Sequence, residues 1–184
     1  PEIIAFREAH LVRYQSTRLA AKYRSLVDKV DDPRLKEAVA KGYHKVLAYK
    51  DEYEVARLLK DTKQKAAAEF DGDLKLTFHM APPFLGGSGP DGRPKKREFG
   101  GWMARVFPVL AGMKQLRGTV FDPFGYSHDR RLERTLIVQY QEDIAELLNY
   151  ANGLNMDIAV ALAELPLQIR GFGPVKLANH AKAM

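Results

Sequence analysis

Apolar residues recur at helical spacing through the first third of the chain. Residues 2–30 contain no glycine or proline, so this pattern predicts one uninterrupted helix. Asp32 is suited to cap a helix and Pro33 to begin one, which places a second long helix at residues 33–69. Two long helices joined by a short turn form an antiparallel hairpin. Gly42 costs the second helix about 1 kcal/mol relative to alanine, so we expect it to permit a close helix crossing.

The pattern then changes to an alternation of apolar and polar residues over residues 74–80, which predicts a strand. Residues 95–99 can return as its partner after a loop rich in glycine and proline, residues 81–94. The run Gly86–Gly89 in that loop lacks the spacing of a phosphate-binding loop, so the tip of a β-hairpin is the favoured interpretation. His79 lies on the polar side of the strand, and no second ligand stands at metal-binding spacing.

Helical spacing returns in the rest of the chain, and the predicted helices cover residues 101–116, 129–150, 152–165 and 174–183. Pro108 lacks a backbone N–H and predicts a kink or break near residues 104–107. Gly118 is expected to end that helix as a left-handed cap. The sequence therefore predicts a mainly α fold, a multi-helix domain with a long N-terminal antiparallel helix hairpin and one small β-hairpin.

Composition narrows the class of protein further. A length of 184 residues predicts a single domain, residues 1–184. The absence of cysteine excludes disulfides, thiolate metal sites and iron–sulfur ligation within this chain. The net charge of +6 comes from basic residues that are interspersed with acids, and the only basic run is residues 93–97, so nucleic acid is not favoured. No apolar run has the length of about 20 residues that a membrane span needs.

The segment Gly118–Arg134 reads GTVFDPFGYSHDRRLER and combines glycines, a proline, aromatics, acids and arginines. On a helical wheel Glu133 falls inside the apolar stripe of the following helix. Arg131 lies opposite that stripe, and Arg130 and Arg134 lie at its border. Because a buried carboxylate needs a partner, we expect Glu133 to be ionised and paired with an arginine from elsewhere in the chain.

Two interpretations of this charge cluster stay open. In the structural one, local acids offset the arginines, and the candidates for a buried ion pair are Glu133 and Asp122. In the functional one, an anion or an acidic surface offsets them. The candidate residues for anion binding or docking are Arg117, Arg130, Arg131, Arg134 and Arg170, of which the first and last are also possible partners of Glu133. Ser127 and His128 are adjacent but lack the context of a nucleophile elbow, so no catalytic residue is assigned.

Five blocks in order resemble one known family. They are Tyr49–Leu59, Leu74–Pro83, Lys96–Met103, Leu116–Arg134 and Ile169–Lys176. The chain resembles the C-terminal domain of the long, single-chain indolepyruvate ferredoxin oxidoreductases, a branch of the 2-oxoacid:ferredoxin oxidoreductases. The resemblance extends over essentially the whole chain and departs at Pro174, where histidine is common in the family.

The resemblance implies a cytoplasmic enzyme that oxidatively decarboxylates 2-oxoacids to acyl-coenzyme A with thiamine diphosphate and iron–sulfur clusters, and reduces ferredoxin. Those cofactors belong to other domains, and none is expected in this chain. Because the sequence opens at Pro1 without a methionine, we expect a fragment excised from a longer multidomain enzyme, without catalytic activity of its own. The expected role is an accessory domain that docks on the thiamine diphosphate and transfer domains of the same polypeptide. The alternatives are a module that binds the phosphates of coenzyme A and a weak nucleic-acid-binding domain; a homodimer stays open.

Overall fold

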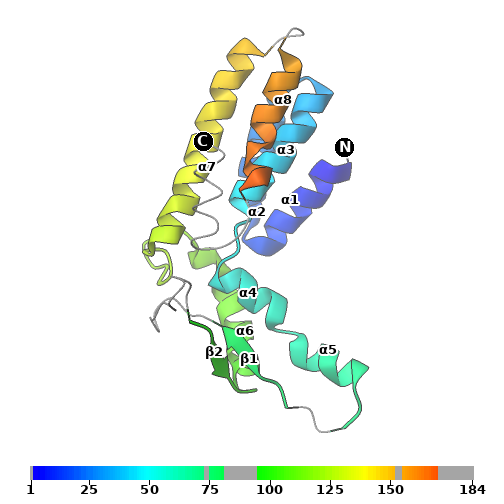
Figure 1. The fold of residues 1–184 in the computed structure, drawn as a ribbon, viewed down its shortest axis with the longest axis vertical. Helices are drawn as coiled ribbons and strands as arrows, with labels where there is room; N and C mark the ends of the chain where they lie inside the picture. Colours follow the sequence, from blue (N-terminus) through cyan, green and yellow to red (C-terminus); the bar gives the residue numbers. More distant parts are fainter. Residues whose placement is uncertain (1, 73–74, 81–94, 152–154, 170–184) are drawn as a thin grey trace. The chain divides into compact units, whose positions relative to one another are not determined.

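The computed structural model describes residues 2–72, 75–80, 95–151 and 155–169. The chain divides into two compact units. Unit 1 comprises residues 1–49 and 128–184, and unit 2 comprises residues 50–127, so unit 2 is inserted in sequence between the two parts of unit 1. The described residues are mainly helical and include one small antiparallel sheet (Figure 1), which confirms the prediction of a mainly α fold with one small β-hairpin.

Unit 1 is built around one central helix. Its elements are α1 (Glu2–Tyr14), α2 (Thr17–Val27), α3 (Pro33–Leu47), α7 (His128–Tyr150), α8 (Met156–Glu164) and the 3-10 turn η3 (Leu165–Gln168). Helix α3 contacts all the others and lies beside α7 and α8 (Figure 1). A central helix of this kind must be apolar on several faces, and eight of its fifteen residues are buried.

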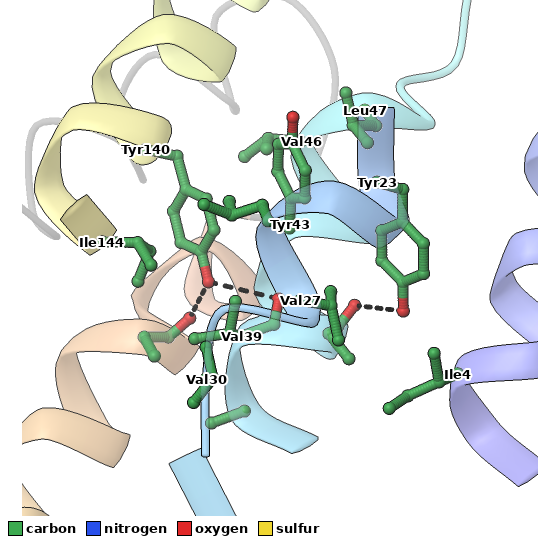
Figure 2. Close-up of a cluster of buried hydrophobic side chains, with 14 of the residues drawn as sticks. Ile4, Tyr23, Val27, Val30, Val39, Tyr43, Val46, Leu47, Tyr140 and Ile144 are labelled. Carbon is green, nitrogen blue, oxygen red and sulfur yellow. Dashed lines mark hydrogen bonds between the residues drawn. The ribbon is translucent and has the colours of Figure 1, made fainter. Parts of the chain in front are cut away.

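Buried tyrosines join α2, α3 and α7 in the core of unit 1 (Figure 2). The ring centroids of Tyr23 and Tyr43 are 6.0 Å apart, and those of Tyr43 and Tyr140 are 5.8 Å apart. The Tyr140 hydroxyl donates to the carbonyl oxygen of Ala163 at 2.8 Å. Gly42 lies at this crossing, where an added Cβ would overlap that carbonyl oxygen and the Tyr140 hydroxyl. The close approach predicted at Gly42 is therefore confirmed.

The single helix predicted over residues 2–30 is wrong. Helix α1 ends at Tyr14 and α2 begins at Thr17. Between them Ser16 has an extended backbone (φ −165°), and its Oγ accepts a hydrogen bond from the Leu19 N–H at 3.2 Å. The hydroxyl satisfies an N–H that has no partner inside the new helix, so the break is stabilised by a serine cap.

The single helix predicted over residues 33–69 is also wrong, because it is three helices. They are α3, α4 (Glu52–Leu59) and α5 (Thr62–Glu69), the last two in unit 2. Asp51 begins α4 by accepting a hydrogen bond from the Glu54 N–H at 2.8 Å. The acid pair Asp51 and Glu54 stands at the spacing of a capping box, and this was the sequence signal for the break.

Unit 2 combines helices with the small sheet. Strands β1 (Phe78–Met80) and β2 (Arg97–Phe99) are antiparallel, with Phe78 opposite Phe99, which confirms the hairpin pairing. The remaining elements are α6 (Met103–Gly112) and the 3-10 turn η2 (Met113–Leu116). A small core holds α4, α6 and β1 together, and its buried members are Ala56, Phe78, Met103 and Phe107.

Helix α6 continues through Pro108, so of the predicted kink or break near residues 104–107 the break is wrong, and the kink stays a prediction. The helix ends instead at Gly112, and the 3-10 turn η2 follows it. Gly118 has φ +75° and lies in the left-handed region, as predicted. Other predicted features lie outside the described residues, namely the start of the strand at Leu74, the loop 81–94, the helix start at 152–154 and the last helix 174–183.

Candidate functional site: an anchored loop with an apolar tip

The loop between η2 and α7, residues 117–127, is the candidate site. A buried ion pair stands at its start. Arg117 Nε lies 2.5 Å from Asp51 Oδ2, and a terminal guanidinium nitrogen of Arg117 lies 2.9 Å from Asp51 Oδ1. The side chains are only 3% and 2% exposed, respectively. A bidentate pair of this kind fixes the guanidinium plane as well as its position. Since Asp51 also caps α4, one carboxylate ties the loop to the start of that helix.

Tyr53 connects the ion pair to the loop. The Arg117 guanidinium carbon lies 5.5 Å from the centroid of the Tyr53 ring, a cation–π contact. The Tyr53 hydroxyl donates to Asp122 Oδ1 at 2.9 Å. Burial raises the pKa of Tyr53 far above its usual range, and the hydrogen bond to Asp122 raises it further. The phenol therefore keeps its proton and remains a donor to the loop carboxylate.

Asp122 organises the loop around its carboxylate, and it is only 3% exposed. Besides the Tyr53 bond, its Oδ2 accepts from the Gly118 N–H at 2.9 Å and its Oδ1 from the Phe124 N–H at 3.1 Å. A Cβ on Gly125 would lie 3.0 Å from Asp122 Oδ2, so the loop closes tightly here. Three hydrogen bonds to one carboxylate compensate for its desolvation and hold the backbone in a single turn.

The tip of the same loop carries large apolar side chains that face solvent. We call Val120, Phe121 and Tyr126 the loop tip; they are 76%, 77% and 62% exposed. The Tyr126 hydroxyl donates to the Val120 carbonyl oxygen at 2.7 Å, and Thr119 Oγ1 accepts from the Phe121 N–H at 3.2 Å. The loop therefore has buried polar anchors and an exposed apolar tip, the reverse of the usual distribution in a surface loop.

The arginines at the start of α7 belong to unit 1 and differ in environment. Arg130 is 4% exposed, and its guanidinium carbon lies 5.6 Å from the centroid of the Tyr49 ring. Glu133 is 5% exposed, as the helical wheel predicts, whereas Arg131 faces solvent. Arg134 is half-buried and lines a shallow hollow together with Arg131. Sequence reasoning placed Arg130 at the border of the apolar stripe, but the side chain is buried.

The structure does not define one anion site from all the candidate arginines. Arg117 is engaged by Asp51 in unit 2, whereas Arg130, Arg131 and Arg134 belong to unit 1, and Arg170 lies outside the described residues. Asp122 accepts hydrogen bonds from Tyr53 and from the backbone in its own unit. Asp51 is the residue that sequence reasoning missed, and its capping-box spacing was the available signal.

A second polar cluster joins α1 to α3 in unit 1. His44 Nδ1 lies 2.9 Å from a terminal nitrogen of Arg7, and His44 Nε2 lies 3.0 Å from His10 Nδ1. Because a guanidinium can only donate, His44 Nδ1 must accept, so Nε2 carries the proton and donates to His10. Burial first, and then the charge of Arg7, lower the pKa of His44 to about 3. His44 is therefore neutral at physiological pH.

No group of three or more histidine, cysteine or acidic side chains in the described part of the chain is arranged to hold a metal ion. None of the helices in residues 2–72, 95–151 and 155–169 combines the length and apolar character needed to cross a bilayer.

Fold and loop define a mainly helical protein that has a small inserted unit and an anchored, apolar-tipped loop. The chain matches the model of DUF6537, a family of unknown function, over residues 1–184, and it belongs to that family. It matches no curated protein and no solved structure.

Proposed function

We propose that this chain is an accessory domain of a 2-oxoacid:ferredoxin oxidoreductase of the indolepyruvate type, and that it docks on the thiamine diphosphate and transfer domains. The support in sequence is the resemblance of five ordered blocks, one of which, Leu116–Arg134, contains the anchored loop. The observation that carries the proposal is the exposed loop tip above a buried carboxylate. Such a loop is suited to contact another protein surface.

Docking would benefit from the way the loop is held. Ordering a mobile loop on association costs about 0.5–1.5 kcal/mol for each immobilised side chain. Here Asp122 and Thr119 already fix the backbone on either side of Phe121, so less of that cost remains. Clustered apolar side chains exposed on a protein surface mark interaction sites. Aromatic anchors contribute a large share of binding energy in protein interfaces.

In this proposal the other domains perform the chemistry. Thiamine diphosphate, iron–sulfur clusters and coenzyme A would bind there, and ferredoxin would accept the electrons. The enzyme would act in the cytoplasm. The present chain would contribute binding surface, and the described contacts of Arg117 and Asp122 would serve to build that surface.

The test is association in trans between this chain and the remaining domains of the enzyme, measured by calorimetry. Changing Phe121 to serine removes a side chain that is 77% exposed and has no place in the described cores, so folding is preserved. We expect F121S to weaken association by tenfold or more, in line with the loss of an interface anchor of about 2 kcal/mol. Normal affinity of F121S would contradict the loop as the docking surface.

The matched control is Ile158→Ser, which removes another apolar side chain, 64% exposed on α8, away from the loop sequence. We expect this variant to bind the remaining domains normally. Equal losses for F121S and I158S would indicate non-specific hydrophobic association. A wild-type chain that shows no association at all would sink the accessory-domain proposal itself.

A further inference from the structure

Unit 1 contains an apolar cavity of about 470 Å³. Its walls come from α7, from α8 with η3, and from Val46 of α3, and they include Leu136, Ile144, Leu147, Leu162 and Pro166. Figure 2 shows Tyr140 and Ile144 of α7 and Val46 of α3 within the buried core of unit 1. The Tyr140 hydroxyl is bonded to the Ala163 carbonyl oxygen, so the ring contributes apolar surface to the wall. The volume is within the range of about 300–1,000 Å³ that is typical of small-molecule sites.

The charged side chains of the lining are both acidic. Asp143 and Glu146 both line the cavity and lie three residues apart on α7, hence on neighbouring positions of one helix face. Within the described part of the chain no lysine or arginine forms an ion pair with either carboxylate. Partial burial, and then the nearby charges of Glu142 and Glu146, raise the pKa of Asp143. An acidic rim is notable in a chain whose net charge is +6.

Aromatic and aliphatic surface continues from the cavity to solvent. Tyr150 and Leu162 line the cavity and are 66% and 48% exposed, respectively. A ligand with an apolar body could therefore enter beside these side chains while its polar end stays at the rim. A cation at the rim would relieve the repulsion between the two carboxylates, whereas an anion would increase it.

We propose that this cavity is a binding site for a small organic cation, an aryl-alkyl amine whose apolar body fills the cavity and whose ammonium group lies between Asp143 and Glu146. Leu147 and Ile144 contact the apolar body, and the two carboxylates select the charge. The inference does not rest on the accessory-domain proposal, because every residue in it belongs to unit 1 and none belongs to the loop tip.

The experiment uses two probes with the same apolar body and opposite charge, 4-phenylbutylamine and 4-phenylbutyrate. Each is titrated into the full chain of 184 residues, with calorimetry for affinity and amide NMR shifts to locate the site. We expect the amine to bind at least about tenfold more tightly than the carboxylate, with shifts centred on α7 and α8. Equal affinity of the two probes, or no binding of the amine at millimolar concentration, would overturn the proposal.

Variants distinguish direct contact of the amine with Asp143 and Glu146 from attraction by the overall negative charge of the helix. Asp143→Asn and Glu146→Gln should each weaken amine binding about two- to fivefold, the range for one exposed ion pair, without changing the fold measured by circular dichroism. Glu142→Gln is the control, since Glu142 is an exposed acid on the same helix that does not line the cavity. If E142Q lowered the affinity for the amine as much as D143N does, the preference for the amine would come from the overall negative potential, and the proposed site would be overturned. Leu162→Trp should fill the cavity and abolish binding of both probes, and unchanged binding in L162W would place the ligand elsewhere.

Discussion

Asp51 and Asp122 show two ways in which unit 2 keeps a carboxylate buried. Asp51 is neutralised by the guanidinium of Arg117, whereas Asp122 is held by hydrogen bonds from a phenol and two backbone N–H groups. The first arrangement depends on one cation, because removing Arg117 leaves a charge in a desolvated position with only the Glu54 N–H as donor. The second distributes the same task over three donors. The residues therefore differ in how much stability a single substitution can remove.

Replacing Arg117 by glutamine should destabilise the protein by about 3–5 kcal/mol, because it leaves the buried Asp51 carboxylate without its cation. The matched control is Arg34→Gln, which removes an ion pair of 2.6 Å whose side chains are 65% and 85% exposed. An exposed pair contributes at most about 1 kcal/mol. Urea unfolding of both variants measures the difference, and similar losses would contradict the role assigned to burial.

The neutral state of His44 predicts a pH dependence of stability. Its pKa is about 3 in the folded chain and near 6.5 when unfolded, so between these values the unfolded chain binds a proton that the folded chain does not. The free energy of unfolding should therefore fall as the pH falls from 6.5 to 3, by up to about 1.4 kcal/mol per pH unit from this group.

The variant His44→Gln provides the comparison, because glutamine can accept from Arg7 and donate to His10 but does not titrate. We expect the difference in stability between the two proteins to shift in favour of the variant as the pH decreases. Parallel stability curves from pH 7 to pH 4 would show that His44 does not contribute.

At the scale of elements, unit 1 depends on how closely α3 approaches α8 and α7. Gly42 has no Cβ, so the Ala163 carbonyl oxygen and the Tyr140 hydroxyl can lie against the backbone of α3. Any other residue would place a Cβ in the space that these two oxygens occupy. The helix loses some intrinsic stability at this glycine, and the packing of three helices compensates for it.

Gly42→Ala should destabilise the protein by about 2–3 kcal/mol, since the added methyl group forces α8 and Tyr140 away from α3. Gly112→Ala is the control. Its backbone is helical (φ −66°) and an added Cβ meets nothing within 4 Å, so this change should be neutral or stabilise by up to about 1 kcal/mol. Thermal unfolding of both variants tests the pair, and a neutral G42A would contradict the crossing.

Features set by local sequence could be predicted, whereas those set by contacts between distant residues could not. The mainly helical class, the hairpin pairing and the close crossing at Gly42 follow from periodicity and from single residues with restricted roles. The breaks at Ser16 and Asp51 were missed because apolar spacing continued across them, although both residues are good helix caps. The pairing of Arg117 with Asp51 joins residues 66 positions apart, which no local pattern specifies.

For the whole molecule, the two compact units imply two cores with separate compositions. The buried residues of unit 1 and of unit 2 form distinct hydrophobic clusters. Because each unit has its own core, we expect one unit to be able to open without exposing the core of the other. This separation can be measured without reference to any function.

The variant Phe107→Ala tests whether unit 2 can be destabilised without affecting unit 1. Phe107 is 1% exposed, and its ring centroid lies 4.9 Å from that of Phe78. Truncation to alanine should therefore lower the free energy of unfolding of unit 2 by about 3–5 kcal/mol. We expect amide hydrogen exchange to accelerate in α4 and α6, while α3 keeps its protection. Uniform acceleration in α3 as well as α6 would show that the two units unfold as one.

The insertion of unit 2 also has a consequence for synthesis on the ribosome. Helices α1 to α3 emerge before unit 2, but the residues that complete their core follow much later, since Gln141 bonds to the Tyr43 hydroxyl across 98 positions. All of residues 50–127 are translated in that interval, and unit 2 has its own core. The inserted unit can therefore fold while the nascent helices α1 to α3 still expose the apolar surface that α7 and α8 will cover, and exposed apolar surface of this kind is prone to aggregation during synthesis.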